Sequence, residues 1–116
     1  MRRILIGLAW ALVALPAWAQ VDPNAAATYL KTCVTMYNNG NTSPETLAAC
    51  DKAIATNPTN GDAYFVKAST LFANGKLINN KWVVSPDTVA ALNQYLSLFP
   101  GGAHASDAKQ MLDALK

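Results

Sequence analysis

Residues 57–76 read NPTNGDAYFVKASTLFANGK, and this stretch has the spacing of an amphipathic helix. Its apolar side chains recur at steps of three and four residues, the spacing of one side of a helix: Tyr64, Ala68, Leu71 and Phe72. Asn74 and Gly75 follow this run and supply a residue that can adopt a positive φ, which is a common way for a helix to end. The pattern therefore predicts a helix over residues 60–74.

The same pattern occurs earlier in the chain. ATYLKTCVTMYNNGN (27–41) aligns with DAYFVKASTLFANGK (62–76) at a constant offset (62 − 27 = 35). SPETLAAC (43–50) aligns with SPDTVAAL (85–92) at a larger offset (85 − 43 = 42), so the second unit contains seven additional residues between its two segments. Self-similarity with a period near thirty-five residues predicts a helical repeat array.

Two further helices have clear starting signals. Ser43-Pro44-Glu45 and Ser85-Pro86-Asp87 each combine an N-cap hydroxyl, a proline at the first helical position and an acid in the first turn. We expect the two serine hydroxyls to cap these helices. The helices predicted from the whole chain cover residues 23–38, 43–56, 60–74, 85–98 and 104–115.

Together these features resemble the tetratricopeptide repeat. The resemblance covers residues 24–116 and rests on two helices per unit, the period, and these positions: Tyr64, Ala68, Gly75, Ala91, Tyr95 and Pro100. The tail YLSLFPGGAHASDAKQML is similar to repeats in exported bacterial proteins. The resemblance implies an all-α fold of tandem helical hairpins in a short right-handed solenoid. Its parts would be repeat one (24–58), repeat two (60–100) with a small insert (77–84), and a closing helix (104–115).

The resemblance also implies a function. In tetratricopeptide repeats the first helices of successive units line a groove that binds peptides or partner proteins. The alignment carries this partner-binding groove over to Leu30, Val34, Tyr37, Phe65, Ser69 and Phe72. The implied function is a noncatalytic module that binds a protein or peptide. The alternative is a structural protein in which the chain's own termini or a second copy, as in a homo-oligomer, cover this apolar face.

The first residues predict export. MRRILIGLAWALVALPAWAQ (1–20) contains two arginines, an apolar run from Ile4 to Leu15, and the small-x-small sequence that ends at Ala19. This is the pattern of a Sec-type signal peptide (1–19) that is removed after Ala19, leaving a periplasmic or secreted domain (20–116) without stable membrane insertion. The apolar run is short for a membrane span, and the alternative is an uncleaved N-terminal anchor.

The charge balance argues against two classes of partner. The chain has nine Lys and Arg against seven Asp and Glu, and loss of Arg2 and Arg3 with the leader leaves seven against seven (9 − 2 = 7). No cluster of Lys and Arg remains. The sequence therefore lacks the electrostatic signature of proteins that bind nucleic acid or an acidic membrane surface.

The two cysteines are positioned to meet. If the first helical hairpin turns near Asn41, Cys33 lies eight residues before the turn and Cys50 nine residues after it. At about 1.5 Å per residue the two residues have nearly the same height on antiparallel helices. In an exported protein this predicts a disulfide, which for a loop of this size stabilises by roughly 3 kcal/mol. The alternative is two buried free thiols that fill core space.

The sequence contains no recognisable catalytic, metal or cofactor site. His104, the one histidine, lies beside Ser106 and Asp107, but neighbours at a helix start do not adopt the spatial geometry of a catalytic triad. The carboxylates are dispersed, and there is no Cys-x-x-Cys pair and no glycine-rich phosphate loop. We therefore expect His104 to pack or cap at the start of the last helix, and we expect no enzyme activity, no metal and no cofactor.

The insert is a second candidate surface. KLINNKWVV (76–84) has apolar, β-prone residues on both sides of Asn79-Asn80-Lys81, which predicts a small hairpin. An isolated hairpin is only marginally stable, so it must contact the helices or a partner. Trp82 is the expected anchor of the insert. Whether the insert recognises a partner or only packs on its own repeat stays open from the sequence.

Overall fold

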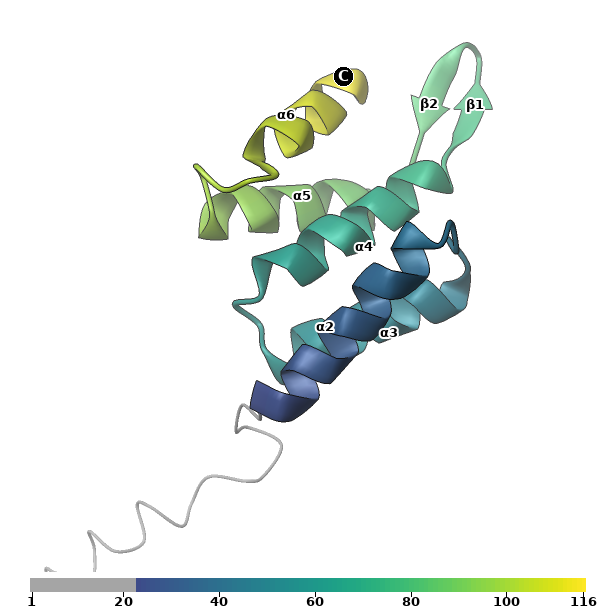
Figure 1. Cartoon of the computed structure of the whole chain (residues 1–116). Coiled ribbons are helices and arrows are strands. Elements are labelled where there is room, and N and C mark those ends of the chain that lie inside the picture. Colours follow the sequence, from purple (N-terminus) through teal and green to yellow (C-terminus); the bar gives the residue numbers. More distant parts are fainter. Residues whose placement is uncertain (1–22) are drawn as a thin grey trace, which may run out of the picture.

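A computed structural model describes residues 23–116; the predicted leader and its cleavage site lie outside the described residues. Five helices and a two-stranded sheet follow one another along this part of the chain (Figure 1). They are α2 (Pro23–Asn38), α3 (Pro44–Thr56), α4 (Gly61–Ala73), β1 (Lys76–Ile78), β2 (Lys81–Val83), α5 (Pro86–Leu98) and α6 (Ala105–Ala114). Each helix begins and ends within one residue of the range expected from the sequence.

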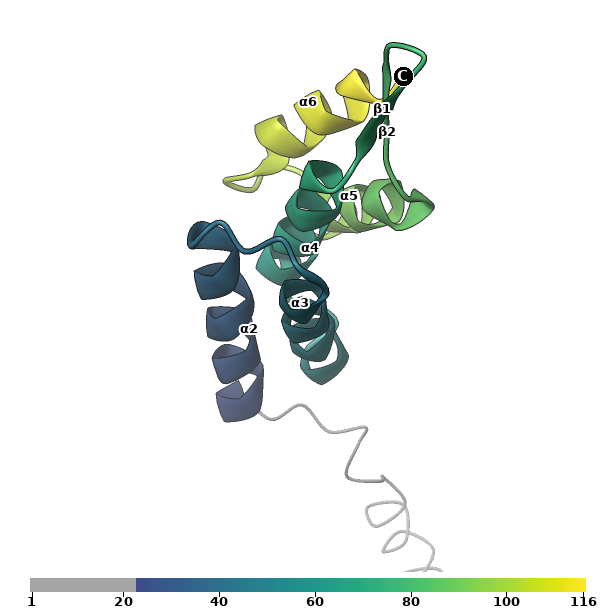
Figure 2. The same cartoon turned by 90° about the vertical axis from the view of Figure 1, so that its right-hand side faces the viewer.

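The helices form two stacked hairpins and a final helix. α2 and α3 pack against each other, α4 and α5 do the same, and α6 packs on α5 (Figures 1 and 2). α4 also contacts both α2 and α3, so the second hairpin rests on the first. The fold is all-α and of the tetratricopeptide type, as the sequence predicted. None of the helices in residues 23–116 is long and apolar enough to cross a membrane.

The first hairpin has a small core tied by a disulfide. Its buried cluster contains Cys33, Ala49, Cys50 and Val66. Cys33 of α2 and Cys50 of α3 are both fully buried and form a disulfide bond that joins the two helices. The predicted pairing is therefore confirmed, and it occupies the centre of this core.

The second hairpin has an aromatic core that α6 completes. Its buried cluster contains Ala68, Ala91, Leu92, Tyr95, Ala105 and Ala108. The Tyr95 hydroxyl accepts a hydrogen bond from the His104 backbone N–H at 3.0 Å. The His104 ring stacks on the Phe65 ring with 4.2 Å between centroids. His104 therefore fixes the entry into α6 by packing, which is the role expected from the sequence.

The expected serine caps do not form. The Ser43 hydroxyl is buried without a hydrogen-bond partner, and the Ser85 hydroxyl lies 3.4 Å from the Thr88 hydroxyl instead of bonding to backbone N–H groups. Asn41 organises the first of these turns: its side-chain oxygen accepts the Ser43 N–H at 2.9 Å, and its carbonyl accepts the Thr46 hydroxyl at 2.7 Å. Asn41 thus orders the turn before α3, while the Thr46 N–H of the first helical turn bonds to the Ser43 carbonyl oxygen at 3.0 Å and not to the serine hydroxyl.

The two helix-ending glycines have different physical roles. Gly40 adopts φ +81°, as expected for a residue that ends a helix in the left-handed region. Gly75 does not adopt a positive φ, so the expectation for this residue was wrong. A Cβ atom on Gly75 would lie 2.7 Å from Trp82 Nε1 and 2.8 Å from the Val83 carbonyl oxygen. Gly75 is needed because the hairpin approaches the end of α4 closely.

Candidate functional site

The predicted partner-binding groove begins on α2. Leu30, Val34 and Tyr37 are all half-buried on this helix. Val34 and Tyr37 pack against the disulfide core, so a part of each side chain supports the first hairpin. The remaining area of the three side chains gives α2 an apolar face that is open in part to solvent.

The matching residues of α4 contact three different neighbours. Phe65 stacks on His104 at the entry to α6, Ser69 is only 7% exposed, and Phe72 lies 6.2 Å from Trp82 between ring centroids. Phe65 and Ser69 therefore serve the core to a large extent, while Phe72 supports the hairpin. We call the six predicted residues the α2–α4 face: Leu30, Val34, Tyr37, Phe65, Ser69 and Phe72.

The insert forms the hairpin that the sequence predicted. β1 and β2 are antiparallel, with Leu77 opposite Trp82 and Ile78 opposite Lys81. Asn79 and Asn80 make the two-residue turn with φ of 51° and 65°, the positive values that a type I′ turn requires and that asparagine tolerates. The β-prone residues and the two asparagines thus explain the hairpin locally.

Trp82 attaches the hairpin to the helices. Its Nε1–H donates a hydrogen bond to the Phe72 carbonyl oxygen at 2.9 Å, close to the end of α4. The Phe72 carbonyl oxygen also accepts the Gly75 backbone N–H at 3.1 Å, so the indole adds a second donor at the end of α4. The indole ring also lies near the Phe72 ring. Trp82 therefore has the contacts of the anchor that we expected, and the insert does pack on its own repeat.

Packing on the repeat leaves much of the hairpin exposed. Leu77 is 67% exposed, Ile78 50%, Val83 45% and Trp82 37%. The packing of the Trp82 ring beside Phe72 leaves this apolar area uncovered. Clustered exposed apolar side chains are the usual mark of an interaction site.

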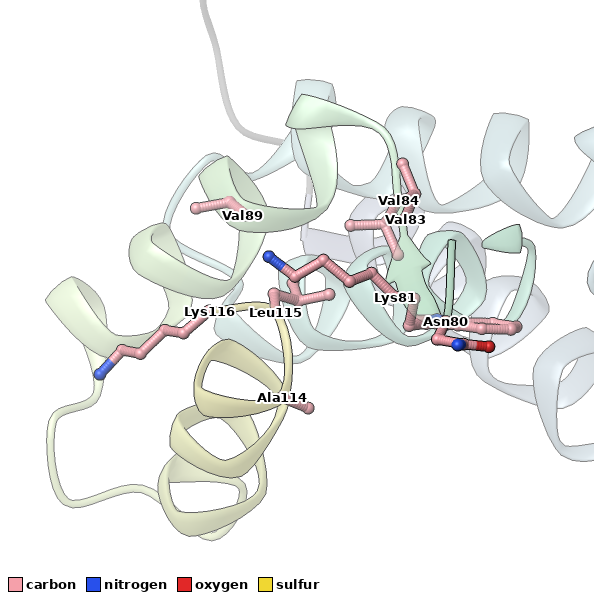
Figure 3. A pocket seen from close by; sticks show the side chains of 9 residues that line it. Asn80, Lys81, Val83, Val84, Val89, Ala114, Leu115 and Lys116 are labelled. Atoms are coloured by element: carbon pink, nitrogen blue, oxygen red, sulfur yellow. The ribbon is translucent and has the colours of Figure 1, made fainter. Parts of the chain in front are cut away.

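A groove of about 490 Å³ lies beside the hairpin. We call it the hairpin–α6 groove; it is lined by Asn80, Lys81, Trp82, Val83, Val84, Val89, Ala114, Leu115 and Lys116. Figure 3 shows these side chains coming from the hairpin, from the first turns of α5 and from the end of α6. Val89 and Leu115 were not among the residues predicted to form a surface, because each lies next to other apolar residues of its helix.

The possible metal ligands among the described residues are dispersed. Within residues 23–116 no group of three or more His, Cys, Asp or Glu side chains is placed to hold a metal ion. The His104 ring is stacked on Phe65, whereas Ser106 and Asp107 are exposed on the first turn of α6. What these surfaces can do chemically is to bind apolar side chains and, through lysines, carboxylates.

Comparison with known proteins gave one match. Residues 49–79 match the family described as Tetratricopeptide repeat. The matched segment runs from α3 through α4 to the first strand of the hairpin, and so includes the second helix of one unit and the first helix of the next. No curated protein and no solved structure matched the chain. The match and the two stacked helical hairpins support the assignment of this chain to the tetratricopeptide repeat family.

Proposed function

We propose that this protein is an exported, noncatalytic interaction module that binds a protein or peptide of the bacterial cell envelope. The carrying observation is the tetratricopeptide match over residues 49–79, because this repeat is typically a protein-interaction module. The α2–α4 face is the proposed binding surface. Five of its six residues are half-buried and so keep apolar area that a partner can cover: Leu30, Val34, Tyr37, Phe65 and Phe72.

Two features support export. Residues 1–19 have the pattern of a signal peptide. The Cys33–Cys50 disulfide is buried in the first core, and structural disulfides persist in oxidising compartments outside the cytosol. The periplasm or the external medium is therefore the proposed location.

A second candidate function is self-association. The same half-buried apolar face would fit a second copy of the chain, because a short array of stacked repeats leaves apolar surface at its ends. In that case the protein would be a structural homo-oligomer. The two functions differ in what covers Leu30, and this difference can be measured.

The test is site-specific photocrosslinking from Leu30. The full-length protein, with a photoreactive residue in place of Leu30, is produced in a bacterium, irradiated and recovered from the envelope fraction. We expect an intact mass that lacks residues 1–19 and two hydrogens, and a crosslink to a different protein identified by its peptides. The purified partner should then bind the unmodified protein, and Leu30→Asp should weaken this binding about tenfold, because one buried apolar contact is lost.

Thr28 provides the matched control. It is exposed on the same helix, two residues away and hence on the opposite side of α2. A photoreactive residue at Thr28 should not capture the partner, and Thr28→Asp should leave binding unchanged. Crosslinks only between copies of the chain, with sedimentation that depends on concentration, would select the homo-oligomer. Equal capture from both positions would remove the α2–α4 face as the binding surface.

A further inference from the structure

Most of the exposed large apolar side chains of residues 23–116 gather in one region. They are Leu77, Ile78, Trp82 and Val83 of the hairpin and Val89 of α5. Phe99 is exposed elsewhere, beside Tyr95. Val83 and Val89, together with Val84 and the half-buried Leu115, line the hairpin–α6 groove. The exposed apolar side chains are therefore concentrated on and beside the hairpin, and a part of them, Val83 and Val89, lines the groove.

One edge of the hairpin faces this groove. In Figure 1 β2 lies on the side of α6, and β1 lies on the far side. Ile78 and Lys81 flank a two-residue turn and therefore exchange backbone hydrogen bonds with each other. In an antiparallel pair the next residues, Leu77 and Trp82, point their backbone N–H and C=O groups away from the other strand. Trp82 thus presents a free backbone edge on the groove side.

The side chains next to this edge combine a positive charge with an apolar group. Lys81 and Val83 are two residues apart on β2 and so lie on the same face of the hairpin. Both line the groove, and Figure 3 shows Lys81 extending from β2 into the space between the hairpin and α6. A strand added along β2 would therefore meet an apolar side chain beside a cationic one.

The charges around the groove are mainly positive. Lys81 and Lys116 line it, and Lys76 lies across from Val83 on β1. Asp113 is the nearby acid, and it pairs with Lys116 at 3.1 Å with both side chains largely exposed. A second copy of the hairpin would bring its own lysines to the same small surface, which is unfavourable. A partner with carboxylates is favoured by charge complementarity.

We propose that the hairpin–α6 groove binds an extended acidic segment of a partner protein. The segment adds to the edge of β2 as a third strand and places an aliphatic side chain against Val83, Val89 and Leu115. Carboxylates two residues away from the aliphatic residue, on the same face, meet Lys81 and Lys116. The strand pairing is short, so the apolar contact and the charges must supply most of the binding. This proposal rests on the proposed interaction function and assigns a surface distinct from the α2–α4 face.

The test uses defined peptides and the mature protein with its disulfide. The probe is the capped peptide TETVTET, which places Glu, Val and Glu on one face of a strand and reads the same in both directions. Titration is followed by backbone amide NMR shifts. We expect shifts at Lys81, Val83, Val89 and Leu115, and about fivefold weaker binding when both Glu become Gln, the change expected for two exposed ion pairs. The peptide TKTVTKT should not bind.

Charge-swapped variants locate the site. Lys81→Glu with Lys116→Glu should abolish binding of TETVTET and create binding of TKTVTKT, because both lysines that line the groove are replaced by acids. Lys76→Glu is the matched control on the outer strand and should change the affinity less than replacement of Lys81 does, as its side chain does not line the groove. Val83→Ser should weaken binding, whereas Ile78→Ser, across the hairpin from Lys81, should have little effect.

The outcomes separate this proposal from the proposed function. Absence of shifts at the groove, or equal binding of the acidic and basic peptides, overturns the proposal. Shifts at Leu30, Val34 and Tyr37 instead would also overturn it while leaving an interaction module. If, without peptide, the backbone amide NMR shifts of β1 and β2 depend on protein concentration, the groove is assigned to contact with a second copy of the chain. The crosslink from Leu30 tests the interaction function independently of all these results.

Discussion

The two helical hairpins join their helices at equivalent positions of the repeat, but by different interactions. At the alignment offsets above, Cys33 corresponds to Ala68 (33 + 35 = 68) and Cys50 to Leu92 (50 + 42 = 92), and all four residues lie in the buried clusters. The first hairpin joins its two helices there by a covalent bond. The second hairpin brings its helices together around apolar side chains alone.

A second pair of equivalent positions suggests why the first hairpin has a disulfide and the second does not. Ala53 in the first hairpin corresponds to Tyr95 in the second (53 + 42 = 95), and both are buried. Tyr95 supplies a large ring that contacts Phe65 and Phe99 and a hydroxyl that holds the entry to α6. The first hairpin has only a methyl group at this position. The comparison teaches that a covalent link can replace the apolar area that a small core lacks.

Truncation of Tyr95 should have the largest effect on this comparison. Tyr95→Ala removes the ring at the centre of the second core and should lower the free energy of unfolding by about 4 kcal/mol. Tyr95→Phe keeps the ring and loses only the acceptor for the His104 N–H, which should cost about 1 kcal/mol. Urea unfolding monitored by circular dichroism measures both. Equal losses for the two variants would show that the ring does not organise the second hairpin.

Replacement of the disulfide should have the next largest effect. Cys33→Ser with Cys50→Ser should lower the free energy of unfolding by roughly 3 kcal/mol, because the closed loop no longer restricts the unfolded chain. Cys33→Ala with Cys50→Leu copies the second hairpin and should recover about 1 kcal/mol through the apolar area of Leu. The same urea experiment compares them. If the Ala–Leu variant has no higher free energy of unfolding than the Ser variant, the residues of the second hairpin cannot replace the two cysteines of the first.

Substitution of the two helix-ending glycines should change the free energy of unfolding least, and its structural effect should be the most local. Gly40→Ala should cost about 1 kcal/mol, because alanine is strained at positive φ. Gly75→Ala should cost a similar amount but displace the hairpin, because the new Cβ would meet Trp82. Trp82 is the single tryptophan of residues 20–116, since Trp10 and Trp18 precede Ala19. Its fluorescence should change in Gly75→Ala and stay constant in Gly40→Ala; the reverse would contradict the two assigned roles.

The candidate surfaces could be predicted from the sequence only in part. The hairpin and its anchor Trp82 were predicted, because β-prone residues around two asparagines are a local signal. The groove beside the hairpin was not predicted, because Val89 and Leu115 look like ordinary core residues within their own helices. The α2–α4 face remains a prediction from the alignment. The contact between Phe65 and His104 could not be anticipated, since the two residues lie far apart in the chain.

For residues 23–116 the sequence predicted the number, order and limits of the helices and the turn of the insert, and it favoured a disulfide over two free thiols. These features depend on spacing, on proline and glycine and on position relative to a nearby turn, all of which act over short stretches of chain. The tertiary structure alone decided that Gly75 makes room for Trp82, that the serine hydroxyls do not cap, and that a groove opens between the hairpin and α6. These outcomes depend on how separate elements pack, and side-chain packing is not encoded in the periodicity of any one helix.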